Sequence, residues 1–461
     1  MNKAVYRSKS GRYTAFCSVS IKKWISCKWS IWKGSNKMQN ERTAKCLQFI
    51  DDSVSCYHVV ANMEKRFKEA GFTELSEKES WELRAGGGYY VKRNDASIVA
   101  FRLPHKEMKG FHIVASHSDS PTFKVKTNPE LLVEDCYLRL NTEPYGGMIY
   151  STWFDRSLSV AGRVIVAKKD GNLESVLVNV DEELLVIPSV AIHMNREANK
   201  GIELNPQIDL LPLMGGKHAK GSLMAKLAEL AGVPQSGILG SDLYLYVREK
   251  GKLAGADKEL IISPRLDDLL CVYASMEALL AKEPKDYASV CAVFHNEEVG
   301  SLTRQGAAST FLKDTLERTA ECFHKSGSEY LRLVADSFLI SADNAHALHP
   351  NHPEKADAAN RPVPNGGIVI KHHGGQKYTT DGYSEAVIRV LCREAEVPCQ
   401  DYHNRSDIAG GSTLGNLSTA QVAVQSADIG LAQFAMHSAV ETAGSRDAEE
   451  LIRVLEVFYQ K

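Results

Sequence analysis

Apolar residues first recur at helical spacing along the chain and then gather into short runs. Between Glu41 and Gly71 they repeat every three or four positions, which predicts an amphipathic helical region that ends at Gly71. Helical spacing returns later, and the stretches that show it are Leu266–Ala281, Leu302–Phe323 and Ser384–Ala395. The short apolar runs are strand-sized: Ser97–Leu103, Phe111–Ser116, Ser289–Phe294, Phe338–Ser341 and Gly367–Ile370. This alternation predicts an α/β sandwich around a mixed sheet.

The pattern changes between residues 122 and 247. Short β-type pieces follow one another there with turn signals between them, and Asp170-Gly171 is typical of a hairpin turn. We interpret residues 122–247 as an inserted β-rich domain. The segments 38–121 and 248–461 then form one larger α/β domain around it.

Composition narrows the class of protein. A chain of 461 residues can bury a core without disulfides, and its 10 cysteines show no paired spacing, which is typical of free thiols in a reducing compartment. We therefore expect a cytoplasmic protein. A net charge of -2 with 44% hydrophobic residues favours neither nucleic acid nor a membrane surface as partner. No apolar run approaches the roughly 18 residues of a membrane span.

The first 37 residues differ from the rest. They contain many Lys and Arg residues but no Asp or Glu, and they lack the apolar core and cleavage site of a signal peptide. We predict that residues 1–37 are a disordered or mis-started extension and that the working chain begins near Met38.

Polar clusters stand at or just after the ends of the predicted strands, where open α/β sheets place their ligand sites. The clusters are His117 with Asp119, the pair Asp267-Asp268, the pair Glu297-Glu298, Asp343, and His437. Each has an ordinary structural explanation by itself, such as a hydrogen-bonded histidine, a helix N-cap or a solvated acidic pair.

A metal centre explains these residues together. Glu297 and Glu298 adjoin a strongly apolar strand, where two unpaired carboxylates would repel each other and a cation would relieve the repulsion. Two His, two Asp and one Glu form a ligand set for two divalent ions that share one carboxylate. Nitrogen and oxygen ligands without Cys favour a catalytic zinc-type site, and the spare Glu can accept a proton.

The order of these motifs closely resembles the aspartyl aminopeptidases, the zinc metallopeptidase family eighteen of clan MH, in their bacterial form. The motifs are His-Ser-Asp-Ser-Pro (117–121), Ser-Pro-Arg-Leu-Asp-Asp (263–268), Asn-Glu-Glu-Val-Gly-Ser (296–301), Ser-Ala-Asp-Asn-Ala-His (341–346) and Ala-Met-His-Ser (435–438). The resemblance runs from about Met38 to the C-terminus. It implies an aminopeptidase domain with an inserted dimerisation domain.

The resemblance also implies how two divalent ions per subunit are held. One is bound by His117, Asp267 and Asp343, and the other by Asp267, Glu298 and His437, so that Asp267 is the bridge. Zinc is the leading choice of metal, with Mn²⁺ or Co²⁺ as alternatives.

Further roles follow from the same resemblance. Asp119 orients the His117 imidazole, and Glu297 is the general base for the water shared by the two ions. His346, Lys371 and Tyr378 are implied substrate contacts. The Lys371 ammonium is suited to hold an acidic side chain or a peptide carbonyl, and the Tyr378 hydroxyl can donate to the developing oxyanion.

The family pattern also predicts self-association. His193 is similar to a histidine that reaches the active site of a neighbouring subunit, which implies a homo-oligomer, with a dodecamer built from dimers as the expected form. Two positions depart from the family pattern. Asp268 stands where Asn is usual, and His295 replaces a common Asp.

The predicted function is removal of an N-terminal residue from peptides, with a preference for Asp or Glu. A related dinuclear aminopeptidase or deacylase of neutral specificity is an alternative, because the metal core acts on the carbonyl that all these substrates share. A non-catalytic oligomeric scaffold is a third hypothesis. The retention of Glu297 beside every ligand argues against a scaffold, which needs no proton acceptor.

Overall fold

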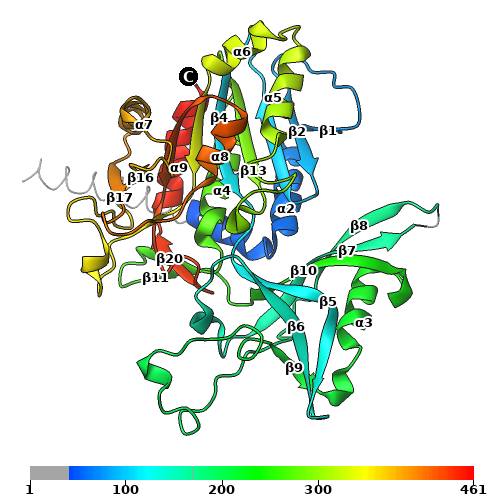
Figure 1. Cartoon of the computed structure of the whole chain (residues 1–461). Helices are drawn as coiled ribbons and strands as arrows, with labels where there is room; N and C mark the ends of the chain where they lie inside the picture. The colour runs from blue at the N-terminus through cyan, green and yellow to red at the C-terminus, as the bar shows by residue number, and fades with distance from the viewer. Residues whose placement is uncertain (1–40, 169) are drawn as a thin grey trace, which may run out of the picture.

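The computed structural model describes residues 41–168 and 170–461, which form a helix-covered sheet of nine strands and a separate sheet of six strands (Figure 1). The predicted α/β sandwich around a mixed sheet is confirmed. The predicted N-terminal extension, residues 1–37, lies outside the described residues. No helix in the described ranges is both long enough and apolar enough to cross a membrane.

The nine-stranded sheet is parallel in its centre and mixed at its sides. Strands β13, β4, β14 and β18 run parallel to one another, whereas β3 and β16 pair antiparallel with this central group. In order across the sheet, the strands are β1 (Thr73–Leu75), β2 (Gly88–Arg93), β3 (Ser97–Arg102), β13 (Ala288–Phe294), β4 (Phe111–His117), β14 (Phe338–Ala342), β18 (Gln425–Gly430), β16 (Ile368–His372) and β17 (Cys399–His403).

Helices cover both faces of this sheet. Helices α2, α4, α7 and α9 contribute to one apolar core, and α5, α6 and α8 contribute to the other. Helix α4 is buried along nearly its whole length because it also packs against α9, which matches its continuous apolar sequence. The helices of this domain are α2 (Cys56–Glu69), α4 (Leu266–Ala281), α5 (Phe311–Glu321), α6 (Ser328–Ala335), α7 (Gly382–Glu394), α8 (Leu414–Gln421) and α9 (Asp447–Tyr459).

Two predicted helices have different bounds in the structure. The region predicted from Glu41 to Gly71 is two helices, residues 41–52 and α2, with a break at residues 53–55. The helix predicted from Leu302 begins only at Phe311. The chain folds tightly on itself before that point, since a Cβ on Gly306 would lie 2.1 Å from the Ser301 carbonyl oxygen. The spacing of apolar residues does not report such a loop.

The six-stranded antiparallel sheet lies between β4 and β11 in the sequence and stands apart from the larger sheet (Figure 1). Helix α3 (Ser222–Ala231) packs on it, and the two share their own apolar core. Its strands, in order, are β8 (Leu173–Asn179), β7 (Leu158–Ala167), β10 (Ile238–Val247), β5 (Thr122–Val133), β6 (Tyr137–Tyr145) and β9 (Leu213–Gly216).

A third, smaller sheet joins segments that are far apart in the sequence. Strands β12 and β20 pair antiparallel over four residues each, which brings the start of α4 next to the connection between β19 and β20. The strands, in order, are β11 (Lys252–Ala254), β12 (Leu260–Ser263), β20 (Glu441–Gly444), β19 (Ala432–Phe434) and β15 (Ala345–His346).

Candidate metal centre

Three of the predicted site segments meet at one edge of the nine-stranded sheet. His117 is the last residue of β4, Asp343 directly follows β14, and the short helix η5 (Glu297–Val299) begins three residues after β13 ends. Since these neighbouring strands are parallel, their carboxyl ends lie at the same edge. The sheet therefore gathers side chains from three distant parts of the chain.

The remaining two residues approach from the small sheet. Asp267 lies at the start of α4, just beyond β12, and His437 lies between β19 and β20. The backbone near both is unusual, because Arg265 and His437 have φ angles of +58° and +66°. Such left-handed conformations in non-glycine residues cost free energy and cluster at functional sites.

The side chains are spaced as the ligands of shared cations would be. Asp267 Oδ1 lies 3.6 Å from His117 Nε2, and Asp267 Oδ2 lies 3.5 Å from His437 Nε2. Glu298 Oε2 is 3.4 Å from the same His437 nitrogen. Two ligand atoms with tetrahedral bonds of about 2.1 Å to one zinc ion lie about 3.4 Å apart. The two oxygens of Asp267 face two different imidazoles, which is the arrangement a bridging carboxylate needs.

Burial makes a cation the natural partner of these groups. The side chains of Asp267 and Glu298 are each 3% exposed, and Asp267 Oδ1 and Glu298 Oε1 have no hydrogen-bond partner in the described structure. A buried polar oxygen without a partner is costly. The two residues therefore fit a divalent ion bound by carboxylate and imidazole groups.

The pKa shifts point the same way. Burial raises the pKa of Glu298 well above its ordinary value and also raises the pKa of Asp343. Burial alone would lower the pKa of His437, but the hydrogen bond to Asp267 and the charge of Glu298 raise it to about 10. The positive charge near the two carboxylates is thus too small to offset their burial, and the His437 imidazole binds a proton readily beside them. A metal ion would supply that charge and leave the imidazole neutral for binding.

Asp119 links His117 to the Glu297-Glu298 pair. Its carboxylate accepts hydrogen bonds from the backbone N–H groups of Glu297 and Glu298, each at 3.2 Å, and from the Tyr145 hydroxyl at 2.7 Å. His117 Nδ1 lies 3.0 Å from the Asp119 carbonyl oxygen and 3.7 Å from its carboxylate. The residue therefore fixes an imidazole and the acidic pair in a single arrangement.

Comparisons with known proteins show the family. The model of the family described as aminopeptidase I zinc metalloprotease (M18) matches residues 49–459. The chain belongs to the M18 aminopeptidase family. A probable M18 family aminopeptidase 2 of Clostridium acetobutylicum is 44% identical over 430 residues, which is 92% of this chain and 99% of that protein. M18 members are metallo-aminopeptidases, so this chain is a hydrolase of that class.

Solved structures of M18 proteins agree in fold. A cryo-EM structure of the Ape4 and Nbr1 complex has a TM-score of 0.89 and 34% identity, and covers 92% of this chain and 86% of that chain. The structure of the S. cerevisiae mApe1 dodecamer has a TM-score of 0.79 and 30% identity, and covers 90% of this chain and 96% of that chain.

Glu297 adjoins the ligands of this M18 chain. A carboxylate oxygen of Glu297 lies within 4.8 Å of ligand atoms of His117 and Glu298. Burial raises the pKa of Glu297 to about 7, with His117 opposing and Asp343 assisting the shift. A carboxylate with a pKa near 7 is matched to accepting and returning a proton at neutral pH.

The predicted substrate contacts lie at different depths. Lys371, the fourth residue of β16, is buried, and its ammonium donates to the carbonyl oxygens of Asp343 at 2.7 Å and Asn344 at 3.1 Å. It also lies 3.6 Å from the Asp343 carboxylate and 5.1 Å above the Tyr378 ring. His346 is exposed on β15. In this structure the Lys371 ammonium therefore supports Asp343, and its contact with a substrate stays a prediction.

Three other predicted positions differ in their surroundings. His193 is exposed in the six-stranded-sheet region and joins none of the ligand groups found in the described ranges. Asp268 is fully buried beside the centre and accepts a hydrogen bond from the backbone N–H of His117 at 3.2 Å. His295 is also buried and lies 3.8 Å from the Asp119 carboxylate.

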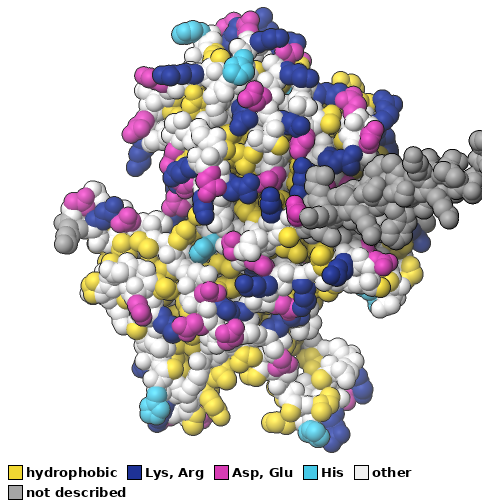
Figure 2. Space-filling model, turned by 180° about the vertical axis from the view of Figure 1, so that it is seen from behind, with side chains coloured by type: hydrophobic (Ala, Val, Ile, Leu, Met, Phe, Trp, Pro, Cys, Tyr) yellow, Lys and Arg dark blue, Asp and Glu magenta, His cyan; other side chains and the backbone are white. Residues whose placement is uncertain are grey.

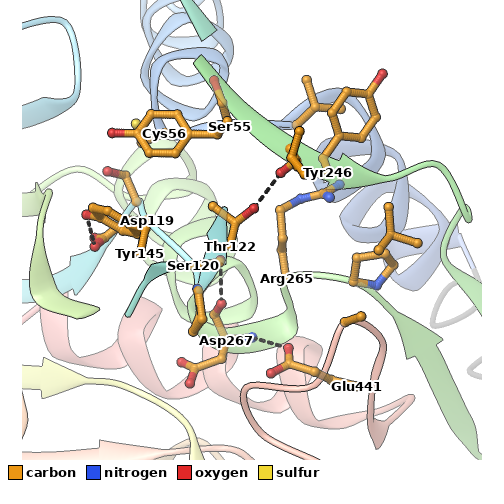
Figure 3. Close-up of a pocket in the computed structure, with 18 of the residues that line it drawn as sticks. Ser55, Cys56, Asp119, Ser120, Thr122, Tyr145, Tyr246, Arg265, Asp267 and Glu441 are labelled. Carbon is orange, nitrogen blue, oxygen red and sulfur yellow. Dashed lines mark hydrogen bonds between the residues drawn. The ribbon is translucent and has the colours of Figure 1, made fainter. Parts of the chain in front are cut away.

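Sequence reasoning missed Glu441. This buried carboxylate accepts a hydrogen bond from the backbone N–H of Asp267 at 3.0 Å (Figure 3) and another from the backbone N–H of His437 at 2.8 Å. Glu441 therefore ties together the backbones of two candidate ligands. Burial raises the pKa of Glu441 to about 8. The only sequence signal was an acidic residue four positions after His437, which no motif singles out.

Proposed function

We propose that this M18 enzyme is a dinuclear aminopeptidase that removes N-terminal residues, with a preference for Asp or Glu. The observation that carries the proposal is the position of Asp267 between two imidazoles, each of which has a further carboxylate close by. His117, Asp267 and Asp343 would hold one zinc ion, and Asp267, Glu298 and His437 would hold the other. Mn²⁺ or Co²⁺ suits the same donors.

The residues of the site would have separate roles in hydrolysis. Bound cations would acidify water and polarise the carbonyl of the scissile bond. Glu297 accepts the proton of the attacking water and returns it to the leaving amine. Asp119 holds His117 and the backbone of Glu297 and Glu298 in fixed positions relative to each other. The Tyr378 hydroxyl would donate to the developing oxyanion, and the Lys371 ammonium lies 5.1 Å above its ring.

A pocket beside the centre supports the acidic preference. It has a volume of about 400 Å³, and its lining includes Lys355, Arg405 and His346 but no Asp or Glu among the described residues. Gln433 also lines it and donates to Glu441, which connects the pocket to the candidate ligands. Arg405 pairs with a neighbouring aspartate outside the lining, whereas Lys355 forms no salt bridge within the described structure. Lys355 is thus the cation most available to an acidic side chain.

We expect Lys355→Met to lower kcat/KM for an Asp-amide about tenfold, the scale of one charged hydrogen bond, and to leave a Leu-amide nearly unchanged. Lys371→Ala should lower both rates alike, because its ammonium supports Asp343. Lys313→Met, at an exposed position on α5, is the control. The measurement is the initial rate of each variant on the Asp-amide and on the Leu-amide. Equal losses of rate on the two amides with Lys355→Met would show that this pocket does not determine the acidic preference.

Neutral specificity is the second candidate, because the metal centre itself acts on the carbonyl. A panel of amino-acid amides and acylated amines separates an acidic aminopeptidase from a neutral one and from a deacylase. Metal analysis before and after chelation tests the centre. We expect two zinc ions per chain and loss of activity on removal of both. A protein that binds no divalent ion would favour the non-catalytic scaffold.

Self-association is part of the proposal. Figure 2 shows hydrophobic side chains on the lobes at the lower end of the molecule, where the six-stranded sheet lies. The exposed large apolar residues of this region include Val190, Ile192, Met194 and Ile208. Such a surface favours burial against another copy. We propose that residues 122–247 form a dimerisation domain, that the resulting dimers build a dodecamer, and that His193 serves a neighbouring subunit. The similar mApe1 structure is itself a dodecamer.

The cysteines support a cytoplasmic location for this enzyme. All eight in the described ranges are free, and most are buried. Free thiols persist in reducing compartments.

A further inference from the structure

One segment of the inserted sheet reaches back to the metal centre. Residues 145–149 join the end of β6 to the short helix η1 (Tyr150–Trp153). Along these five residues, the Tyr145 side chain contacts Asp119 and the backbone contacts His437. The contacts involve residues that sequence analysis did not single out.

Tyr145 makes the first contact. Its buried hydroxyl donates to Asp119 Oδ2 at 2.7 Å (Figure 3). The same hydroxyl accepts a hydrogen bond from Asn296 Nδ2 at 2.8 Å. Asp119 in turn faces His117, and Asn296 precedes the Glu297-Glu298 pair. A single hydroxyl therefore sets the position of the carboxylate on one side and of the acidic turn on the other.

The two glycines that follow make the next contacts. Gly146 has a φ of +80°, which glycine adopts most readily, and a Cβ there would lie 3.1 Å from Glu298 Cβ, a tight contact that would push the two residues apart. The Gly147 carbonyl oxygen lies 2.7 Å from His437 Nδ1, and the Ile149 N–H donates to the His437 carbonyl at 2.9 Å. An imidazole whose Nδ1–H is held by a carbonyl presents Nε2 to a metal.

We infer that residues 145–149 are a positioning element for the metal centre: Tyr145 orients Asp119, and the backbone of Gly147 and Ile149 orients His437. The inference rests on the proposed function, because it takes His117 and His437 as ligands. It assigns the inserted sheet a part in metal affinity that is separate from self-association. Residues that orient ligands in this way typically change metal affinity or activity 10- to 100-fold when replaced.

The first test removes one hydroxyl. We expect Tyr145→Phe to weaken zinc binding about 10- to 100-fold in chelator competition, and to change the absorption spectrum of the Co²⁺-loaded enzyme. Tyr244→Phe is the matched control, since its ring packs edge-on against Tyr145 at 5.4 Å and its hydroxyl has no hydrogen bond within the described residues. Both variants are measured as the full-length protein. Equal zinc affinity and an unchanged cobalt spectrum in Tyr145→Phe would overturn the inference.

A second pair of variants tests the backbone. Gly146→Ala should also weaken zinc binding, because the new methyl group pushes against Glu298. Gly71→Ala is the control for backbone strain alone, since Gly71 has a φ of +81° and open space around its Cβ position. Loss of affinity in Gly71→Ala as large as in Gly146→Ala would contradict the contact as cause. Wild-type protein that binds no zinc would instead refute the proposed function, which separates the two failures.

Discussion

Glu297→Gln is expected to lower kcat by about 10² to 10⁴, with little change in bound metal. Glutamine keeps the size and the backbone hydrogen bond to Asp119 but cannot accept a proton. The pKa of the Glu297 carboxyl, raised to about 7 by burial, suits this residue for reversible proton transfer near neutrality. Steady-state rates on the best amide substrate, together with metal analysis of the same samples, measure the effect.

The matched control is Glu321→Gln, an exposed glutamate at the end of α5 that should leave both rate and metal content unchanged. A Glu297→Gln variant with wild-type kcat would show that the proton acceptor is another group. A variant that is inactive because it has lost its metal would instead make Glu297 a ligand. Measuring rate and metal content on one preparation distinguishes these outcomes.

The sequence predicted those parts of the fold that apolar spacing controls. Strands β3, β4, β13, β14 and β16 were found within two residues of their observed bounds, because each is a short apolar run buried in the sheet. Strand β18 lies equally deep but was missed. Its sequence, Gln-Ser-Ala-Asp-Ile-Gly, places polar residues at buried positions, where Asp428 accepts a hydrogen bond from Thr379.

The candidate ligands could be predicted for a different reason. His117, Asp343 and Glu298 stand close to strand ends, so a parallel sheet brings them together whatever the lengths of the connections. Their grouping follows from topology. The family resemblance then supplied Asp267 as the bridge, and the structure places it between His117 and His437.

The supporting groups could not be predicted. Glu441 and Tyr145 act through backbone N–H groups and through a neighbouring carboxylate, and these contacts depend on how three separate sheets meet. The surroundings of Lys371 could not be predicted from the sequence either. Its chemistry suits an acidic substrate, but the fold buries its ammonium against the Asp343 and Asn344 carbonyls.

Asp267→Asn is expected to abolish zinc binding at both positions and to remove all measurable hydrolysis. An amide offers one oxygen and no charge, so it can neither bridge two ions nor balance their positive charge. A ligand at 100 times its Kd stabilises a protein by about 2.7 kcal/mol. Added zinc should therefore raise the melting temperature of the wild-type enzyme but not of Asp267→Asn.

A second acidic cluster of this chain provides the control for that experiment. His372, Glu385 and Asp401 are also close enough to hold an ion, but the Arg389 guanidinium already lies 2.7 Å from both carboxylates. A cation in that place would meet the positive charge of the arginine. Asp401→Asn should thus keep two zinc ions and the full zinc-dependent rise in melting temperature. If Asp267→Asn kept that rise as well, the buried carboxylate would not be the bridge, and the paired-metal mechanism would lose its central residue.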